Sequence, residues 1–197
     1  MKEIVGTRRH YLNQRNCMMV MLENDVIPIV NENDTISVTE LMFTDNDELS
    51  GLIASMMDSV ALIILSNVDG IYNGSPSDPF ATVIRKVEFG KDLRDYIQTE
   101  KSGFGRGGML TKTNIARKVA DEGIEVIIAN GKRDNILLDI LKKPEETICT
   151  RFVPGTVEVS SVKKWIAHSA GFAKGKLFLN ECVTKVLKDD KAVSLLP

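Results

Sequence analysis

The fold is decided by residues 45–65, which read DNDELSGLIASMMDSVALIIL. Apolar side chains recur in the first part at the three- and four-residue spacing of an amphipathic helix, which we expect over residues 45–60. Asp45 and Glu48 fit a capping box, in which the Asp oxygen accepts a backbone amide and the Glu side chain reaches back. Residues 61–65 are apolar without interruption, as in a parallel strand that helices cover on both faces.

Helix and strand patterns alternate on both sides of this stretch. We predict further helices over 9–24, 110–122 and 135–143, part of 83–100 as a short surface helix, and strands over 26–30, 124–129 and 147–153. Gly123 and Pro144 are stop signals for two of these helices. This alternation favours an α/β fold, a mostly parallel sheet with helices on both faces.

Composition excludes several classes of protein. The 197 residues carry a formal net charge of −2, without the basic excess of a nucleic-acid binder. No apolar run approaches the ~20 residues that span a bilayer, and the first residues lack an apolar signal core. The three cysteines are far apart, and His10 and His168 do not have metal-ligand spacing. We therefore predict a cytoplasmic protein with no disulfide framework, no protein-bound metal, and no membrane or nucleic-acid partner for this portion.

Polar clusters follow the predicted strands or begin the predicted helices. In open parallel sheets, ligands bind in the crevice beyond the carboxyl ends of the strands, so these clusters are candidate binding loops. Each cluster taken singly is also explained by turns or helix caps. The clusters are Asn31-Glu32-Asn33-Asp34-Thr35, Asp45-Asn46-Asp47 and Ser66-Asn67-Val68-Asp69-Gly70.

A fourth cluster is the glycine-rich loop over residues 103–108, which precedes Met109-Leu110-Thr111-Lys112. Glycines let backbone amides approach an anion closely, and the start of the next helix adds unpaired amides and a positive dipole end. Arg106 and Lys112 supply positive charge. The loop is not a Walker motif, and it follows a charged segment instead of a strand, so a dinucleotide site is a weak interpretation. A phosphate-binding loop is the better hypothesis.

The order and spacing of these motifs resemble the glutamate 5-kinases of the amino-acid kinase family, over about Arg9 to Pro154. The likeness is carried by four runs together, which are much more specific than any one of them. The runs are Ile27-Pro28-Ile29-Val30-Asn31-Glu32-Asn33-Asp34, Asp45-Asn46-Asp47-Glu48-Leu49-Ser50, Val68-Asp69-Gly70-Ile71-Tyr72 and Gly105-Arg106-Gly107-Gly108-Met109-Leu110-Thr111-Lys112.

The resemblance implies transfer of the γ-phosphoryl of ATP to the side-chain carboxylate of glutamate, the first step toward proline, with Mg²⁺ bound through the phosphates. Asp47 matches the family aspartate that orients the catalytic lysines, and Lys112 would neutralise the phosphates. Asn31, Asp34 and Asn46 would hold glutamate. The residues that match the family's ATP contacts are Ser66, Asn67, Arg106, Gly107, Gly108, Met109, Leu110, Thr111 and Lys112.

The sequence departs from the family pattern in two places. Asn67 stands where aspartate is usual, and the family's first strand and lysine-bearing glycine loop have no counterpart before the helix at Tyr11. We therefore expect residues 1–157 to be a partial kinase domain (substrate loop and ATP half) with impaired catalysis. Residues 158–197 resemble the linker and start of a truncated PUA-like domain. Without the family's first strands, apolar surface of the sheet would be exposed, which predicts self-association as a homo-oligomer.

Two alternatives remain open from the sequence. The chain could be a non-catalytic module that binds nucleotide or amino acid. It could also be another amino-acid kinase, acting on acetylglutamate, carbamate or a nucleoside monophosphate, although the Asn-Glu-Asn-Asp and Asp-Asn-Asp runs disfavour this.

Overall fold

The computed structural model describes residues 8–31, 46–75, 78–91, 93 and 108–156, with the single positions 178, 180, 181 and 184. The described helices are α2 (Arg8–Glu23), α3 (Asn46–Met56), α5 (Met109–Asp121) and α6 (Ile136–Lys142). The strands are β1 (Ala61–Ser66), β2 (Lys86–Val87), β3 (Glu125–Asn130) and β4 (Thr150–Phe152), in the sheet order β1-β3-β4-β2.

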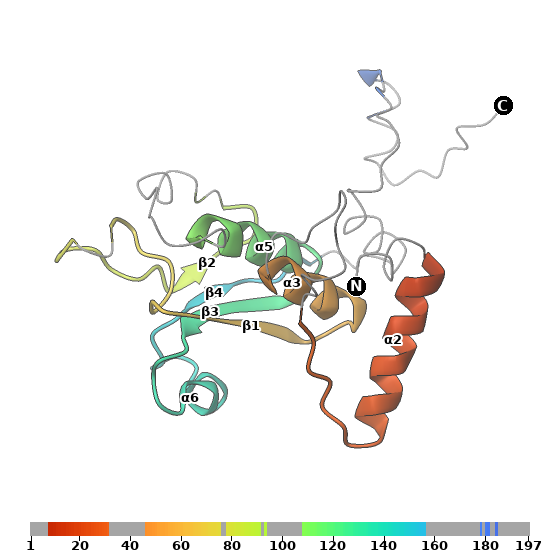
Figure 1. Ribbon diagram of the computed structural model, residues 1–197. Coiled ribbons are helices and arrows are strands. Elements are labelled where there is room, and N and C mark those ends of the chain that lie inside the picture. Colours follow the sequence, from red (N-terminus) through yellow and green to blue (C-terminus); the bar gives the residue numbers. More distant parts are fainter. Residues whose placement is uncertain are drawn as a thin grey trace.

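Helices cover both faces of this sheet, α3 and α5 on one face and α6 on the other (Figure 1). The pairs β1–β3 and β2–β4 are parallel, while β3 and β4 are antiparallel. Two of the three described pairings are therefore parallel. The predicted α/β fold, with a mostly parallel sheet between helices, is confirmed.

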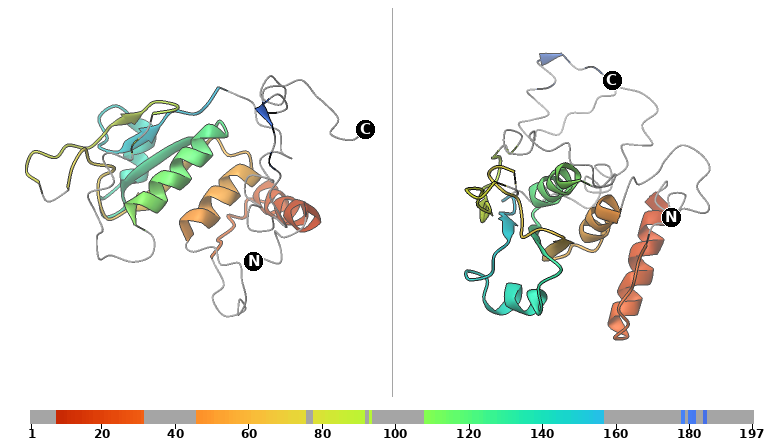
Figure 2. Two further views of the ribbon diagram at one scale, coloured as in Figure 1. Left: turned by 90° about the horizontal axis from the view of Figure 1, so that it is seen from above. Right: turned by 60° about the vertical axis from the view of Figure 1, so that its left-hand side comes forward.

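The middle strand β3 shows why these strands are apolar throughout. Val126 and Ile128 belong to the cluster under α3 and α5, while Ile127 and Ala129 belong to the cluster under α6. All four side chains are at most 2% exposed, because alternate residues of a strand point to opposite faces and both faces are covered. Seen from above, α3 and α5 lie next to each other across the sheet (Figure 2).

Helix α2 stands beside this body and packs on α3. Tyr11 and Met18 are buried against Leu52 and Met56 in a small apolar cluster. Arg15 adds a polar contact, because its Nε donates a 3.0 Å hydrogen bond to the carbonyl of Met56. The predicted helix over 9–24 is confirmed within one residue at each end.

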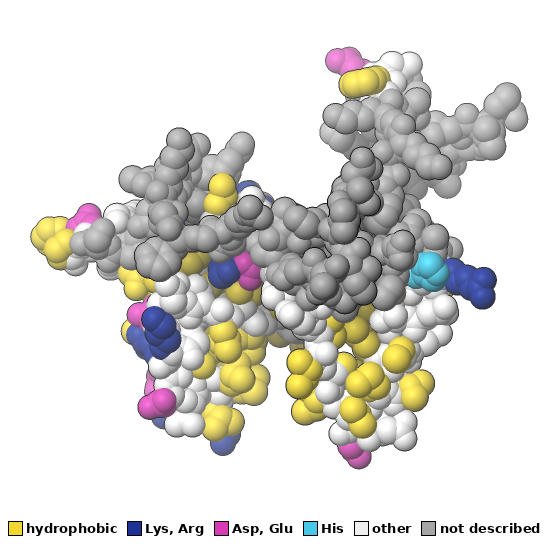
Figure 3. All heavy atoms as spheres, in the orientation of Figure 1, with side chains coloured by type: hydrophobic (Ala, Val, Ile, Leu, Met, Phe, Trp, Pro, Cys, Tyr) yellow, Lys and Arg dark blue, Asp and Glu magenta, His cyan; other side chains and the backbone are white. Residues whose placement is uncertain are grey.

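The predicted strand over 26–30 is wrong in this structure. These residues continue from α2 without joining a strand, and Ile27 and Ile29 are 82% and 97% exposed. Pro28 has no N–H to give to a sheet, which weakens any pairing of so short a segment. Together with Val20 and Leu22 of α2, this segment leaves hydrophobic side chains on the surface (Figure 3).

The other predicted elements agree with the structure within a few residues. Helix α5 ends at Asp121, two residues before Gly123, whose φ of +89° suits glycine, and β4 is shorter than its predicted range. Within the predicted surface segment 83–100, residues 86–87 form the short strand β2. Residues 92 and 94–100 lie outside the described residues, so the helix expected in part of this segment stays a prediction. Asp45 of the predicted capping box, and nearly all of 158–197, lie outside the described residues. In the described part of the chain, no helix is long and apolar enough to cross a membrane.

Candidate functional site

Helices α3 and α5 run side by side in the same direction. Their contacts follow the sequence order of both helices: Asp47 meets Lys112, Gly51 meets Ile115, and Ser55 donates a hydrogen bond to the Glu122 carboxylate. Both helices therefore begin at the same end of the pair. Their N-terminal turns, each the positive end of a helix dipole, lie next to each other.

Gly51 allows the two helices to approach closely. A Cβ atom built at Gly51 would stand 2.8 Å from Cγ2 of Ile115 and 3.2 Å from Cγ2 of Val119. Real Cβ atoms essentially never come within 3.0 Å of a non-bonded heavy atom of another part of the chain, so only glycine fits without a shift. Asp47 is one helical turn before Gly51, and Lys112 is one turn before Ile115, so the close contact also sets the spacing of these two side chains.

The central feature of the site is an ion pair between Lys112 and Asp47. Nζ of Lys112 lies 2.5 Å from Oδ2 of Asp47, and their side chains are only 17% and 15% exposed. Ser50 supports the turn that carries Asp47, because its hydroxyl donates to the Asp47 carbonyl at 2.7 Å. A largely shielded pair is screened less by water and salt than a surface pair, so each charge strongly fixes the position of the other.

The opposite end of the α3–α5 seam is also polar. Ser55 and Glu122 are both buried, and the Ser55 hydroxyl donates to the Glu122 carboxylate. Burial lowers the pKa of the nearby Lys118, and the negative charges of Glu122 and Glu48 partly oppose this shift. The seam therefore holds a second group of charges behind the Lys112–Asp47 pair.

The ion pair lies at the carboxyl edge of the parallel strands. Helix α3 leads through a short turn into β1, and α5 leads through Gly123 into β3, so the beginnings of both helices lie at the ends of those strands. Ser66 ends β1 and Asn67 follows it; the Ser66 hydroxyl is 3.4 Å from Oδ1 of Asn67. The structure thus brings the two predicted catalytic residues into contact and places two predicted ATP contacts on the same edge.

The start of α5 is suited to an anion. Gly108 occupies the N-cap position in an extended conformation and has no side chain to bond the first amides. Its carbonyl accepts the amides of Thr111 and Lys112 at 3.0 and 3.3 Å. The first amides of a helix have no partner within the helix, so this terminus can donate hydrogen bonds to phosphate oxygens.

The remaining predicted residues are distributed as follows. Asn31 is exposed at the end of the segment that follows α2, and Asn46 is exposed at the first position of α3. Met109, Leu110 and Thr111 form the first turn of α5; Met109 packs on the core and Leu110 is 53% exposed. Asp34, Arg106 and Gly107 lie outside the described residues.

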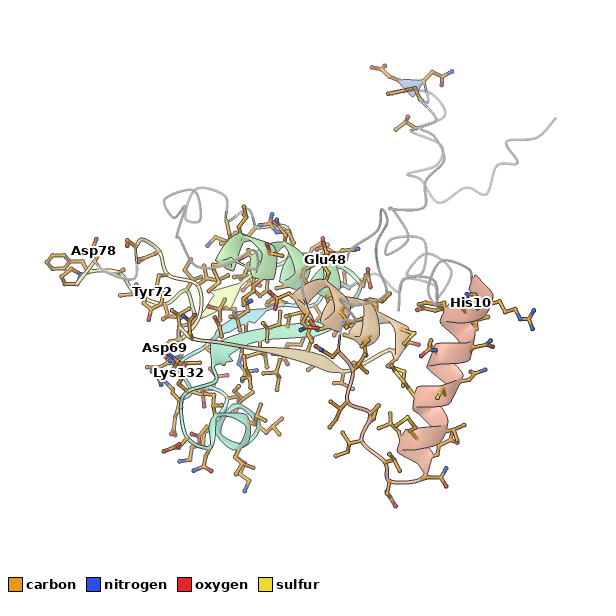
Figure 4. The ribbon with its side chains drawn as sticks, in the orientation of Figure 1. His10, Glu48, Asp69, Tyr72, Asp78 and Lys132 are labelled. Atoms are coloured by element: carbon orange, nitrogen blue, oxygen red, sulfur yellow. The ribbon has the colours of Figure 1, made fainter. Side chains whose placement is uncertain are left out.

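Sequence reasoning missed two partners of Asp69 at the same edge, Asn130 and Arg133. Asp69 accepts hydrogen bonds from Asn130, the last residue of β3, and from Arg133 in the loop that follows. Figure 4 shows Asp69 beside Lys132 of the same loop. Burial, followed by the charge of Asp69, raises the pKa of the nearby Tyr72. Asp69 belonged to a predicted polar cluster, and the crevice rule, applied one residue beyond the predicted strand 124–129, points to Asn130.

The chain is similar in sequence to known kinases. Residues 3–130 match the model of the amino acid kinase family. Glutamate 5-kinase from Bacteroides thetaiotaomicron is 76% identical over 196 residues, which are 100% of this chain and 54% of that protein. Glutamate 5-kinase from Chlorobaculum tepidum is 47% identical over 193 residues, 96% of this chain and 52% of that protein. The chain thus spans about half the length of these relatives.

A solved structure supports the same fold at low sequence identity. The crystal structure of UMP kinase from Ureaplasma parvum superposes with a TM-score of 0.50 at 18% identity, covering 71% of this chain and 52% of that one. The family match covers more than half of the chain, and two of the motifs that carry the resemblance supply the ion pair between Asp47 and Lys112. The chain belongs to the amino acid kinase family.

Proposed function

We propose that this protein phosphorylates the side-chain carboxylate of glutamate with ATP, the first step of proline biosynthesis, and that Lys112 and Asp47 are its catalytic residues. The ion pair between these two side chains, at the adjoining N-termini of two parallel helices, is the observation that carries the proposal. The choice of glutamate rests on relatives that are named glutamate 5-kinase.

The proposed chemistry needs positive charge more than it needs a covalent partner. The bond from the γ-phosphorus to the β-phosphate oxygen breaks, and a bond from that phosphorus to a glutamate carboxylate oxygen forms, giving an acyl phosphate and ADP. Negative charge spreads over the transferred and leaving oxygens, so a fixed ammonium group lowers the barrier. Lys112 supplies this group, and Asp47, 2.5 Å away, holds it in place.

Glutamate and ATP are assigned to the residues that the family pattern indicates. Asn31, Asp34 and Asn46 hold glutamate, and the Asp34 carboxylate pairs with its ammonium group. The N-terminus of α5 has no side-chain cap and can donate backbone amides to the ATP phosphates. This supports the assignment of residues 108–112 to ATP. The full set proposed for ATP is Ser66, Asn67, Arg106, Gly107, Gly108, Met109, Leu110, Thr111 and Lys112.

Mg²⁺ enters this proposal on the phosphates of ATP. The described residues contain no group of three or more His, Cys, Asp or Glu that could hold a metal ion. Mg²⁺ would take most of its oxygen ligands from the substrate phosphates and from waters, as is usual in phosphoryl-transfer enzymes. The ion would neutralise charge between the phosphates, beside Lys112.

The organisation of the chain is part of the same proposal. Residues 1–157 form the substrate and ATP part of the kinase domain, and residues 158–197 begin a PUA-like domain. We also infer a cytoplasmic location and a homo-oligomer. The exposed apolar segment after α2 supports the oligomer, since its side chains are free to pack against a second copy.

The test measures nucleotide binding and catalysis separately on the purified chain. A fluorescent ATP analogue with Mg²⁺ reports binding, and trapping with hydroxylamine reports glutamate-dependent formation of the acyl phosphate. Lys112→Ala is compared with Lys142→Ala, which removes the same charge from an exposed position on α6. We expect Lys112→Ala to lower any catalytic rate by about a hundredfold and to weaken nucleotide binding, whereas Lys142→Ala changes neither.

The outcomes separate the competing functions. Glutamate-dependent turnover that Lys112→Ala abolishes supports the kinase. Nucleotide binding without turnover favours the non-catalytic binding module, or the impaired catalysis expected from the sequence. Turnover that depends on acetylglutamate, carbamate or a nucleoside monophosphate, and not on glutamate, would assign the chain to another amino-acid kinase. Equal behaviour of Lys112→Ala and Lys142→Ala would contradict the role of Lys112.

A further inference from the structure

The loops that follow β1 and β3 leave the sheet side by side. Ser66 and Asn130, the last residues of these parallel strands, are register partners. The amide of Gly131 then donates a 2.8 Å hydrogen bond to the carbonyl of Ser66, which continues the pairing one residue past β3. A Cβ atom at Gly131 would stand 3.1 Å from Cβ of Leu65, so the absence of a side chain helps this close approach.

Asp69 connects these two loops with both oxygens of its carboxylate. Oδ1 accepts a hydrogen bond from Nδ2 of Asn130 at 2.9 Å, and Oδ2 accepts one from the Arg133 guanidinium at 2.8 Å. Asn130 is itself oriented, since its Oδ1 accepts the amide of Lys132 at 3.0 Å. Asp69 is only 22% exposed, so these charge-assisted bonds are shielded in part from water.

The far end of the Asp69 loop is also fixed. The amide of Ile71 donates to the Thr150 hydroxyl at 2.8 Å, and Gly70, with a φ of +155°, packs so closely that a Cβ atom would stand 2.5 Å from that hydroxyl. Residues 67–70 therefore run between two anchored points, Ser66 and Ile71. Asp69 is the side chain in this stretch that joins it to the loop after β3.

We propose that Asp69 is a positioning residue for nucleotide binding, acting by holding the Ser66-Asn67 segment against the loop after β3. The inference rests on the proposed function, which assigns Ser66 and Asn67 to ATP. Both Asp69 oxygens already accept hydrogen bonds from Asn130 and Arg133, so the role we assign to Asp69 is to hold this loop and not to contact the nucleotide.

The sign of the effect separates positioning from simple charge. Removing a negative charge near a polyanion should by itself strengthen ATP binding. Positioning predicts the opposite, so we expect Asp69→Asn to weaken the affinity for the fluorescent ATP analogue by about tenfold, the loss expected from a charged hydrogen-bonding partner. Asp134→Asn is the matched control, because Asp134 is exposed in the same loop as Arg133 and carries the same charge.

Hydrogen exchange provides the second readout. The Gly131 amide, which bonds the Ser66 carbonyl, should exchange faster in Asp69→Asn than in wild type and in Asp134→Asn. The exchanged pair Asp69→Asn with Asn130→Asp restores an amide–carboxylate bond between the loops and should recover part of the affinity. If Asp69→Asn fails to fold, Asn130→Ala tests the same connection, because it removes one of the two bonds and leaves the Asp69 charge.

The results divide as follows. Weaker binding together with faster Gly131 exchange supports the inference. Unchanged or tighter binding by Asp69→Asn, with a wild-type chain that binds nucleotide, overturns it and leaves the proposed function standing. Weaker binding with unchanged Gly131 exchange also overturns it, because the loss would not come from the loop. A wild-type chain that binds no ATP overturns the proposed function, and the role of Asp69 falls with it.

Discussion

The backbone amide of Ile71 donates a 2.8 Å hydrogen bond to the hydroxyl of Thr150, where the two residues are only 1% and 0% exposed. Thr150 is the first residue of β4, and Ile71 lies in the loop that follows β1. One buried hydroxyl thus fastens a candidate binding loop to the sheet, 79 residues away in the sequence.

Thr150→Val tests how much this hydrogen bond contributes. Valine has nearly the same shape but no acceptor, so the Ile71 amide would be left buried without its partner. We expect the free energy of unfolding to fall by about 1–3 kcal/mol. Urea denaturation followed by circular dichroism measures the change. Thr82→Val, at an exposed position, is the matched control. An equal fall in the free energy of unfolding in both variants would show that the Ile71–Thr150 hydrogen bond does not stabilise the fold.

Substitution of Gly51 tests the close approach of α3 and α5. Alanine is the better helix former by up to ~1 kcal/mol, but its Cβ would force Ile115 or Val119 to move. We expect overpacking to dominate, with a lower melting temperature for Gly51→Ala and a further fall for Gly51→Val. Asn114→Val, on the exposed side of α5, controls for the helix propensity of valine. A Gly51→Ala chain more stable than wild type would contradict the tight contact.

Tyr11 predicts a specific loss of stability at alkaline pH. Burial, and next the negative charge of Asp58, raise the pKa of Tyr11 from 10.0 to about 12. The folded state holds this proton more tightly than the unfolded state does. The contribution of Tyr11 to the free energy of unfolding is therefore complete below pH 10 and is lost as the pH rises toward about 12. Unfolding free energies measured across this range should fall less steeply in Tyr11→Phe. Parallel slopes for the two proteins would show that Tyr11 is not the group responsible.

The exposed segment after α2 predicts self-association. Ile27 and Ile29 are 82% and 97% exposed, and they lie next to further exposed apolar side chains of α2. Burying this surface between two copies is favourable, so we expect the chain to form concentration-dependent oligomers in sedimentation experiments. Ile27→Lys with Ile29→Lys should shift the distribution to monomer. Leu141→Lys, at a 73% exposed position on α6, should not. A wild-type chain that is monomeric at all concentrations would refute the prediction.

Much of the fold could be predicted from local pattern. The spacing of apolar residues in α3 and α5, the uninterrupted apolar strands β1 and β3, and the stop at Gly123 each depend on neighbours within a few residues. The segment 26–30 shows where local pattern fails. Its apolar residues suggest a strand, but a strand exists only where another strand satisfies its backbone, and the described structure provides no such pairing there.

By itself, the sequence determined which residues are apolar, charged or turn-forming, and therefore the order of helices and strands and the presence of a glycine loop before Lys112. Only the tertiary structure decided that Lys112 meets Asp47, that Gly51 sets the spacing of their helices, and that Asp69 joins two loops through Asn130 and Arg133. The physical reason is the distance along the sequence between the interacting residues. Periodicity fixes the face of a helix or strand on which a side chain lies, whereas the partner it meets across 60 or more residues depends on how whole elements pack.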